Sequence, residues 1–186
     1  MQTENPVIVG LDIGTTKIAA IAGRKNEFGK LEILGFGKSD SSGVNHGMVL
    51  NIDECIRSIN IALDECLASN PNLNIKEVYV GIAGHHIKSL QTRGDRVINN
   101  VEEEIRREDI DALIKDQYKT FIPANDQIID IIPQDFTVDA LEGFSMQEVV
   151  GMTGVRIGAN FHIVTGDKSA IRNIHRCVQR ANLATK

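Results

Sequence analysis

The stretch VIVGLDIGTTKIAAIAG, residues 7–23, decides how the beginning of this chain folds. Two runs rich in Val, Ile and Ala flank the polar segment DIGTTK, a pattern typical of two strands joined by a tight turn. Gly14 allows the backbone of that turn to approach a ligand closely, and successive N–H groups in such a turn can form an anion-binding nest. The stretch therefore predicts a β-hairpin whose turn is either an ordinary turn or a cradle for phosphate.

The predicted turn carries the residue types that a phosphate site needs. Thr15 and Thr16 add hydroxyl groups, and Lys17 adds an ammonium group, which is a recurrent partner of phosphate. Asp12, at the end of the first predicted strand, could hold a hydrated Mg²⁺ through a water. The alternatives are that Asp12 only accepts hydrogen bonds from turn amides and that Lys17 is a solvated residue at a strand edge. The chain contains no Gly-x-x-x-x-Gly-Lys-Ser/Thr motif, so a P-loop is not the route to phosphate.

Composition narrows the class of protein. The chain has 186 residues, of which 42% are hydrophobic and 24% charged, as in ordinary globular proteins. The net charge of -5, without a run of Lys or Arg, and the aromatic content of 4% argue against nucleic acid as the main partner. No stretch approaches the roughly 20 apolar residues that span a bilayer, and the polar N-terminus lacks the basic start of a signal peptide. We therefore expect a cytosolic chain.

The cysteines and histidines indicate neither a metal site nor a nucleophilic site. Cys55 and Cys66 lie about three turns apart on one predicted helix, which suits core residues on a shared face. The five histidines form no pair or cluster of zinc-type spacing, and no catalytic Ser/His/Asp or Cys/His set is suggested. We therefore expect no catalytic residues. The remaining cysteine is Cys177, and the histidines are His46, His85, His86, His162 and His175.

Beyond the hairpin, local patterns predict a third strand at 31–37, a helix and a further strand at 78–83. Asn51 is the expected N-cap of the helix, with Glu54 placed to complete a capping box, and Pro71 ends it. The strand at 78–83 is apolar on both faces, which suits a central strand covered on both sides. These elements are typical of an α/β sheet.

The middle of the chain is more polar, and its patterns predict antiparallel strands around one helix. The segment 127–138 is either a strand pair or one strand interrupted by Pro133, which indicates an edge or a bend. Asp167 is the expected cap of a last helix with one apolar side. The other predicted elements are an exposed strand over 86–99, a helix over 108–115 and an alternating strand over 154–165. An inserted unit that interrupts one α/β sheet is the economical interpretation.

The order of hairpin, third strand and helix, with Asp-x-Gly-Thr in the first turn, resembles the nucleotide-binding lobe of the actin/Hsp70/sugar-kinase superfamily. Further segments resemble the FtsA family of bacterial cell-division proteins within it, in order and over essentially the whole chain. These segments are GFG at 35–37 with GVNHGMV at 43–49, VYVGIAGHHI at 78–87, and IIPQDFTVD at 131–139 with GMTGVR at 151–156. The resemblance implies an α/β fold, an actin-like (RNase H-like) lobe with a small α+β inserted subdomain of the SHS2 type.

The same resemblance implies a domain division and a ligand. Residues 1–83 and 162–186 would form subdomain 1A, and residues 84–161 the inserted subdomain 1C. The phosphates of ATP would be bound by residues of the first turn, with Mg²⁺ placed by Asp12 through a water. Any ATPase activity would be slow at most. The implied phosphate-binding residues are Asp12, Gly14, Thr15, Thr16 and Lys17.

The resemblance further implies a division adaptor that polymerises and tethers the FtsZ ring to the cytoplasmic side of the bacterial inner membrane. The insertion would serve self-association and contacts with other division proteins. Family members are longer than this chain, which is expected to be an N-terminal part that binds ATP weakly. FtsZ would then be bound mainly by the second lobe, and the membrane by a C-terminal helix. The alternatives are a sugar-kinase-type phosphotransferase and a pilus-assembly adaptor of the same superfamily.

Overall fold

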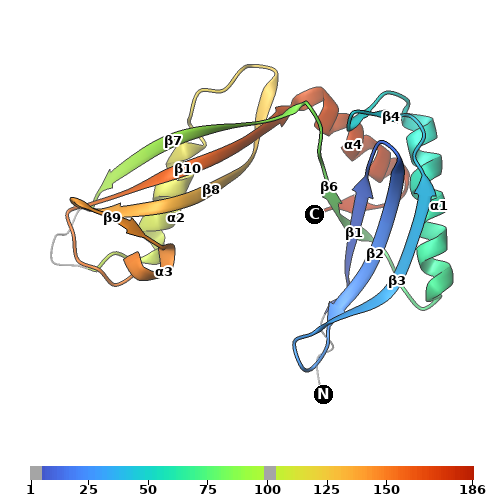
Figure 1. The fold of residues 1–186 in the computed structure, drawn as a ribbon, viewed down its shortest axis with the longest axis horizontal. Helices are drawn as coiled ribbons and strands as arrows, with labels where there is room; N and C mark the ends of the chain where they lie inside the picture. The colour runs from blue at the N-terminus through green and yellow to red at the C-terminus, as the bar shows by residue number, and fades with distance from the viewer. Residues whose placement is uncertain (1–5, 99–103) are drawn as a thin grey trace. The chain divides into compact units, whose positions relative to one another are not determined.

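The computed structural model describes residues 6–98 and 104–186, and these divide into two compact units (Figure 1). Unit 1 comprises the described residues up to His86 together with Ser169–Lys186, and unit 2 comprises Ile87–Lys168. Unit 2 therefore interrupts unit 1 in sequence. Asn99, the last residue of the strand expected over 86–99, lies outside the described residues.

Unit 1 is built on a five-stranded sheet in the order β11-β6-β1-β2-β3. β1 and β2 pair antiparallel from Ile8↔Gly23 to Ile13↔Ile18, which confirms the predicted hairpin. β2 pairs antiparallel with β3, whereas β1 pairs parallel with β6 and β6 parallel with β11. The strands are β1 (Ile8–Ile13), β2 (Lys17–Lys25), β3 (Leu31–Asp40), β6 (Glu77–Gly81) and β11 (Ala184–Thr185).

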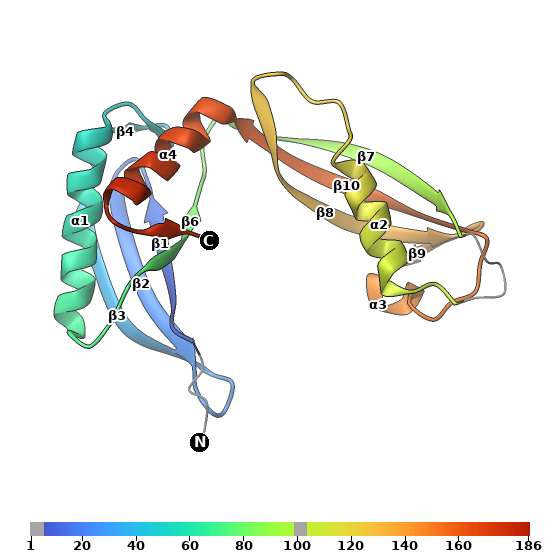
Figure 2. The same cartoon turned by 180° about the vertical axis from the view of Figure 1, so that it is seen from behind.

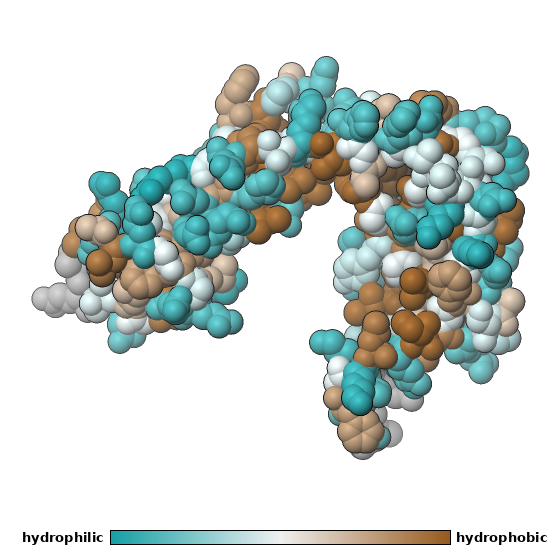
Figure 3. Space-filling view, viewed as in Figure 1, coloured by the Kyte–Doolittle hydropathy of each residue, from teal (hydrophilic) through white to brown (hydrophobic). Residues whose placement is uncertain are grey.

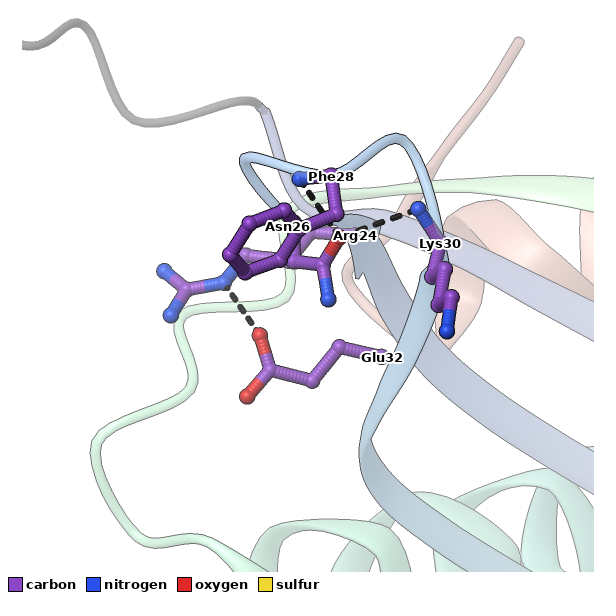
Figure 4. A network of polar contacts seen from close by, with 5 residues as sticks. All are labelled: Arg24, Asn26, Phe28, Lys30 and Glu32. Atoms are coloured by element: carbon purple, nitrogen blue, oxygen red, sulfur yellow. Dashed lines mark hydrogen bonds and ion pairs between the residues drawn. The ribbon is translucent and has the colours of Figure 1, made fainter.

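One side chain, that of Asn26, bonds twice to the backbone of the turn between β2 and β3 (Figure 4). Asn26 Oδ1 accepts hydrogen bonds from the backbone N–H groups of Phe28, at 3.0 Å, and Lys30, at 2.9 Å. Across the two strands, Arg24 Nε lies 3.0 Å from Glu32 Oε2. A short Asn side chain that bonds the backbone ahead of it is a common way to build such turns. Local sequence therefore accounts for this connection.

Two helices cover one face of this sheet, as Figure 2 shows. α1 (Ile52–Ser69) follows the small hairpin of β4 (Val44–Asn45) and β5 (Met48–Val49), and α4 (Lys168–Arg180) follows unit 2. The Asn51 side chain accepts a hydrogen bond from the Glu54 N–H at 3.2 Å, which confirms the predicted N-cap. Alternate residues of β1 and β2 point at these helices, so the core lies between the sheet and the helix pair. Its buried members include Leu11, Ile18, Ala20, Ile59, Ala62 and Val178.

The cysteines are buried and free, and Cys55 and Cys66 lie in this core as expected. Cys177 of α4 lies against Cys55 of α1. The Cys55 thiol donates a hydrogen bond to Cys177, which raises the pKa of Cys55 and lowers the pKa of Cys177. The contact joins two helices that are separated in sequence by the whole of unit 2.

The expectation that the strand at 78–83 is covered on both faces is wrong for the described part of the chain. Val78 is fully buried beneath the helices, whereas its neighbour Tyr79 is 46% exposed on the other face. This strand carries apolar residues on both faces, but α1 and α4 cover only one of them. Figure 3 shows the resulting apolar surface on the open face of unit 1. We call this side, on which Ile8, Ile21, Phe36 and Tyr79 are exposed, the open face.

Unit 2 is a four-stranded antiparallel sheet in the order β7-β10-β8-β9, with helices on one face. Its core contains Ile110 and Leu113 of α2 together with Phe136 and Phe161 of the sheet. The elements are β7 (Ile87–Val97), α2 (Arg107–Gln117), β8 (Asp126–Val138), β9 (Leu141–Phe144), α3 (Met146–Val149) and β10 (Arg156–Asp167).

Pro133 lies within one long strand, β8, rather than between two strands. β8 pairs with β10 through Phe161↔Pro133 and Ala159↔Phe136, so two residues of β8 face one of β10 in a bulge. β9 pairs only with Phe136–Val138, which leaves β8 at the edge of the sheet at Pro133. The proline therefore occupies an edge position beside a bulge, where its missing N–H is tolerated.

The two units meet in sequence at His86 and at Lys168. β10 runs without interruption to Asp167, through the point between residues 161 and 162 where the resemblance implied a subdomain boundary. Its pairing with β7 also continues to Ile87↔Gly166. Because the ladder is continuous, the whole of β10 belongs to unit 2.

Candidate phosphate-binding site

The β1–β2 turn is a tight turn that leaves no room for a side chain at Gly14. The Gly14 N–H donates to the Lys17 carbonyl oxygen at 3.0 Å and closes the turn. A Cβ at Gly14 would lie 2.9 Å from that same oxygen, closer than real Cβ contacts occur. Thr15, Thr16 and Lys17 are exposed around the bend. The turn thus presents two hydroxyls and one ammonium group to solvent.

Neighbouring segments hold the turn in place. The Gly47 N–H, at the tip of the β4–β5 hairpin, donates to Thr15 Oγ1 at 3.2 Å. The Ser41 N–H donates to the Thr16 carbonyl oxygen at 3.2 Å. Because Thr15 Oγ1 accepts the bond from Gly47, its own hydroxyl proton is free to point at an incoming acceptor. Two contacts from the segment before α1 therefore fix the position of the turn.

Asp12 and Lys17 both line a cavity of about 380 Å³ on the open face. Asp12 lies between Ala19 of β2 and Gly81 of β6 in the sheet register. A Cβ at Gly81 would lie 3.6 Å from Asp12 Oδ1, so the glycine leaves the space beside the carboxylate open. Lys38 of β3 lines the same cavity. One carboxylate and two ammonium groups thus share a concave surface.

The structure divides the predicted site residues into two groups. Asp12 and Lys17 line the cavity, whereas Gly14, Thr15 and Thr16 form the turn at the end of the two strands and do not line it. Lys38 was missed by sequence reasoning. Its place depends on the pairing Ala19↔Lys38, and that register follows from a bulge near Gly23 that no local pattern shows.

The donor set fits a phosphate ligand with a hydrated magnesium ion. Lysine ammonium groups and hydroxyls bind phosphate oxygens, and a lone carboxylate typically holds Mg²⁺ together with waters and substrate phosphates. Within residues 6–98 and 104–186, no three His, Cys, Asp or Glu side chains are placed to hold a metal by themselves. The arrangement therefore suits a metal that arrives with its phosphate ligand.

Known proteins match this chain in both of its units. The family model described as the SHS2 domain inserted in FtsA matches residues 84–165. The cell division protein FtsA of Pseudomonas aeruginosa is 38% identical over 177 residues, which cover 95% of this chain and 41% of that protein. FtsA of Neisseria meningitidis is 35% identical over 183 residues, which cover 98% of this chain and 43% of that protein.

Nearly the whole chain is thus similar to FtsA proteins, and residues 84–165 match the SHS2 domain inserted in FtsA. It spans about two fifths of the length of the FtsA proteins that it matches. The match at 84–165 falls on the part of the chain that forms unit 2, and the FtsA similarity extends over unit 1 as well. The resemblance to FtsA expected from the sequence is confirmed.

A solved structure supports the fold. The PilM–PilN type IV pilus biogenesis complex aligns with a TM-score of 0.64 at 13% sequence identity, over 96% of this chain and 45% of that one. At that identity the likeness shows a shared fold alone. The expected fold class, an actin-like α/β lobe with an SHS2 insertion, is confirmed. In the described part of the chain, every helix is too short or too polar to span a bilayer.

Proposed function

We propose that unit 1 binds the phosphate groups of ATP at the β1–β2 turn and the adjoining cavity. The observation that carries the proposal is that Asp12 and Lys17, from the two strands of one hairpin, line the same cavity next to a turn with exposed threonines. Lys17 would neutralise phosphate charge, Thr15 and Thr16 would donate hydrogen bonds, and Gly14 would allow close approach. Asp12 would orient Mg²⁺ through a water.

The wider role that we propose is that of a cell-division adaptor. The relatives are named as cell division proteins, and unit 2 belongs to the part of the chain that matches the SHS2 domain inserted in FtsA. The whole protein would polymerise and tether FtsZ filaments to the cytoplasmic face of the inner membrane at the division site. Unit 2 would contact other division proteins or further copies. FtsZ and the membrane would be bound by regions of the family proteins that this chain does not span.

Nucleotide binding by this chain alone is expected to be weak. An ATP site of the actin-like kind is a cleft between two lobes, and the residues of the β1–β2 turn and the adjoining cavity would supply one wall of it. One wall supplies only part of the contacts that a complete cleft would give, so we expect a dissociation constant on the order of millimolar. Any ATPase activity would be slow, since Asp12, the carboxylate beside the turn, would orient Mg²⁺ rather than act as a base.

Amide NMR of the purified chain, titrated with ATP and Mg²⁺, tests the phosphate site. We expect the backbone signals of Gly14, Thr15, Thr16 and Lys17 to shift together and to saturate. Lys17→Gln should weaken binding about tenfold, the effect of removing about 1.4 kcal/mol. The matched control is Lys30→Gln, at the exposed β2–β3 turn, which should leave binding unchanged. Equal weakening by both substitutions, or shifts confined to other regions, would refute the proposal.

A further inference from the structure

Three loops of unit 1 lie next to one another at one end of its sheet. The first is the β1–β2 turn, the second is the tip of the β4–β5 hairpin, and the third is the segment that follows β6. The second is joined to the first by the Gly47–Thr15 hydrogen bond of 3.2 Å. A Cβ at Gly47 would overlap the Ala83 carbonyl oxygen, so the hairpin tip packs directly on the third loop. Because β1 and β6 are parallel neighbours, this is the edge at which α/β sheets bind ligands.

Two exposed histidines face each other at this junction. The ring centroids of His46, at the hairpin tip, and His85, after β6, lie 5.5 Å apart with a tilt of 36°. His46 has a φ of 48°, a left-handed conformation that the contacts of its neighbour Gly47 support. A Cβ at Gly84 would lie 2.5 Å from the His46 carbonyl oxygen, so the backbones beneath the rings are also in close contact. Contacts between the two backbones, rather than the contact between the rings, therefore fix the positions of His46 and His85.

A third histidine, His86, directly follows His85 in the chain. His86 is buried, with only 6% of its surface exposed. Among the described residues, neither its Nδ1 nor its Nε2 has a hydrogen-bond partner. A Cβ built at Gly84 would lie 2.9 Å from His86 Nδ1, so this ring also lies close to the Gly84 backbone. Buried polar side chains normally have partners, so the two ring nitrogens of His86 are open to a water or a ligand atom beside the exposed pair.

We propose that His46 and His85 bind the terminal phosphate of the nucleotide, next to Thr15; this inference rests on the proposed function. A neutral imidazole carries one N–H donor and an imidazolium two, and either form can bond a phosphate oxygen. The ligand is a polyphosphate rather than a bare metal ion, because no set of three metal-binding side chains exists in the described residues. Since the β1–β2 turn would hold the inner phosphates, the histidines favour a triphosphate over a diphosphate.

Histidine NMR of the purified chain, titrated with tripolyphosphate, tests this inference. Tripolyphosphate has no base or sugar, so it reports on phosphate contacts alone. We expect the ring signals of His46 and His85 to shift and saturate together with the amide of Gly14. The internal controls are His162 of β10 and His175 of α4, whose signals should stay unchanged. Pyrophosphate should shift the Gly14 amide but should move the two histidine signals much less.

Substitutions separate the histidines from the turn. The double variant His46→Asn with His85→Asn should weaken tripolyphosphate binding about tenfold and pyrophosphate binding by less than threefold, with His162→Asn as the matched control. If the Gly14 and Thr15 amides respond while the two rings do not, the histidine role is overturned and the proposed phosphate site stands. If neither responds, both are overturned. Equal losses for both probes would also refute selection by the histidines.

Discussion

Gly47 is the residue on which the loops around the turn depend. Its φ is 77°, and a Cβ there would overlap the Ala83 carbonyl oxygen. We expect Gly47→Ala to lower the free energy of unfolding by about 3 kcal/mol, the sum of a left-handed backbone penalty and overpacking. Urea denaturation followed by circular dichroism measures the change.

Gly29 is the matched control for this substitution. Its φ of 73° is nearly the same, but no atom lies within 4 Å of its added Cβ. Gly29→Ala should therefore show the backbone penalty alone, about 1 kcal/mol. Equal losses at Gly47 and Gly29 would mean that the close contact between the hairpin tip and the loop after β6 does not exist.

Among the elements, the close packing of α1 on β3 depends on a strand glycine. A Cβ at Gly37 would overlap the Ala62 carbonyl oxygen of α1. We expect Gly37→Ala to push the helix away from the strand and to lower the free energy of unfolding by about 1–3 kcal/mol. Thermal unfolding would show this as a lower midpoint temperature.

Gly10→Ala is the control within the same sheet. No atom lies within 4 Å of a Cβ added at Gly10, which faces the open side of β1. The change in stability should stay within about 0.5 kcal/mol. A loss at Gly10 as large as that at Gly37 would show that strand conformation, and not contact with α1, limits these positions.

At the scale of the whole molecule, unit 2 is built to fold by itself. Ile87 and Gly166, near its two ends, are paired in the β7–β10 ladder, and its core is separate from that of unit 1. We expect residues 87–168 alone to unfold cooperatively, as monitored by circular dichroism. Phe161→Ala, at a side chain 1% exposed, should cost that isolated unit about 3–5 kcal/mol.

Phe121 provides the control for this prediction. Its side chain is 93% exposed, so Phe121→Ala removes the same atoms without opening a cavity. The expected change is within about 0.5 kcal/mol. An unfolded fragment 87–168, or equal losses for the two Phe substitutions, would contradict an independent core in unit 2.

Local signals in the sequence were sufficient for most elements. The polar break DIGTTK between two β-rich runs predicted the β1–β2 hairpin, because a turn and its strands depend on neighbouring residues. The cap at Asn51 was predictable for the same reason. The domain boundary near Lys168 was not, since it depends on the ladder between β10 and β7, whose partners are far apart in the chain.

For the candidate site, sequence alone determined the turn chemistry: Gly14 for the bend, hydroxyls at Thr15 and Thr16, and the charges of Asp12 and Lys17. Only the tertiary structure decided that Lys38 joins Asp12 at one cavity and that His46 meets His85 beside the turn. It also decided that the Tyr79 face of the sheet is open. The physical reason is that backbone conformation is set by adjacent residues, whereas strand register and loop packing are set by contacts between segments distant in sequence.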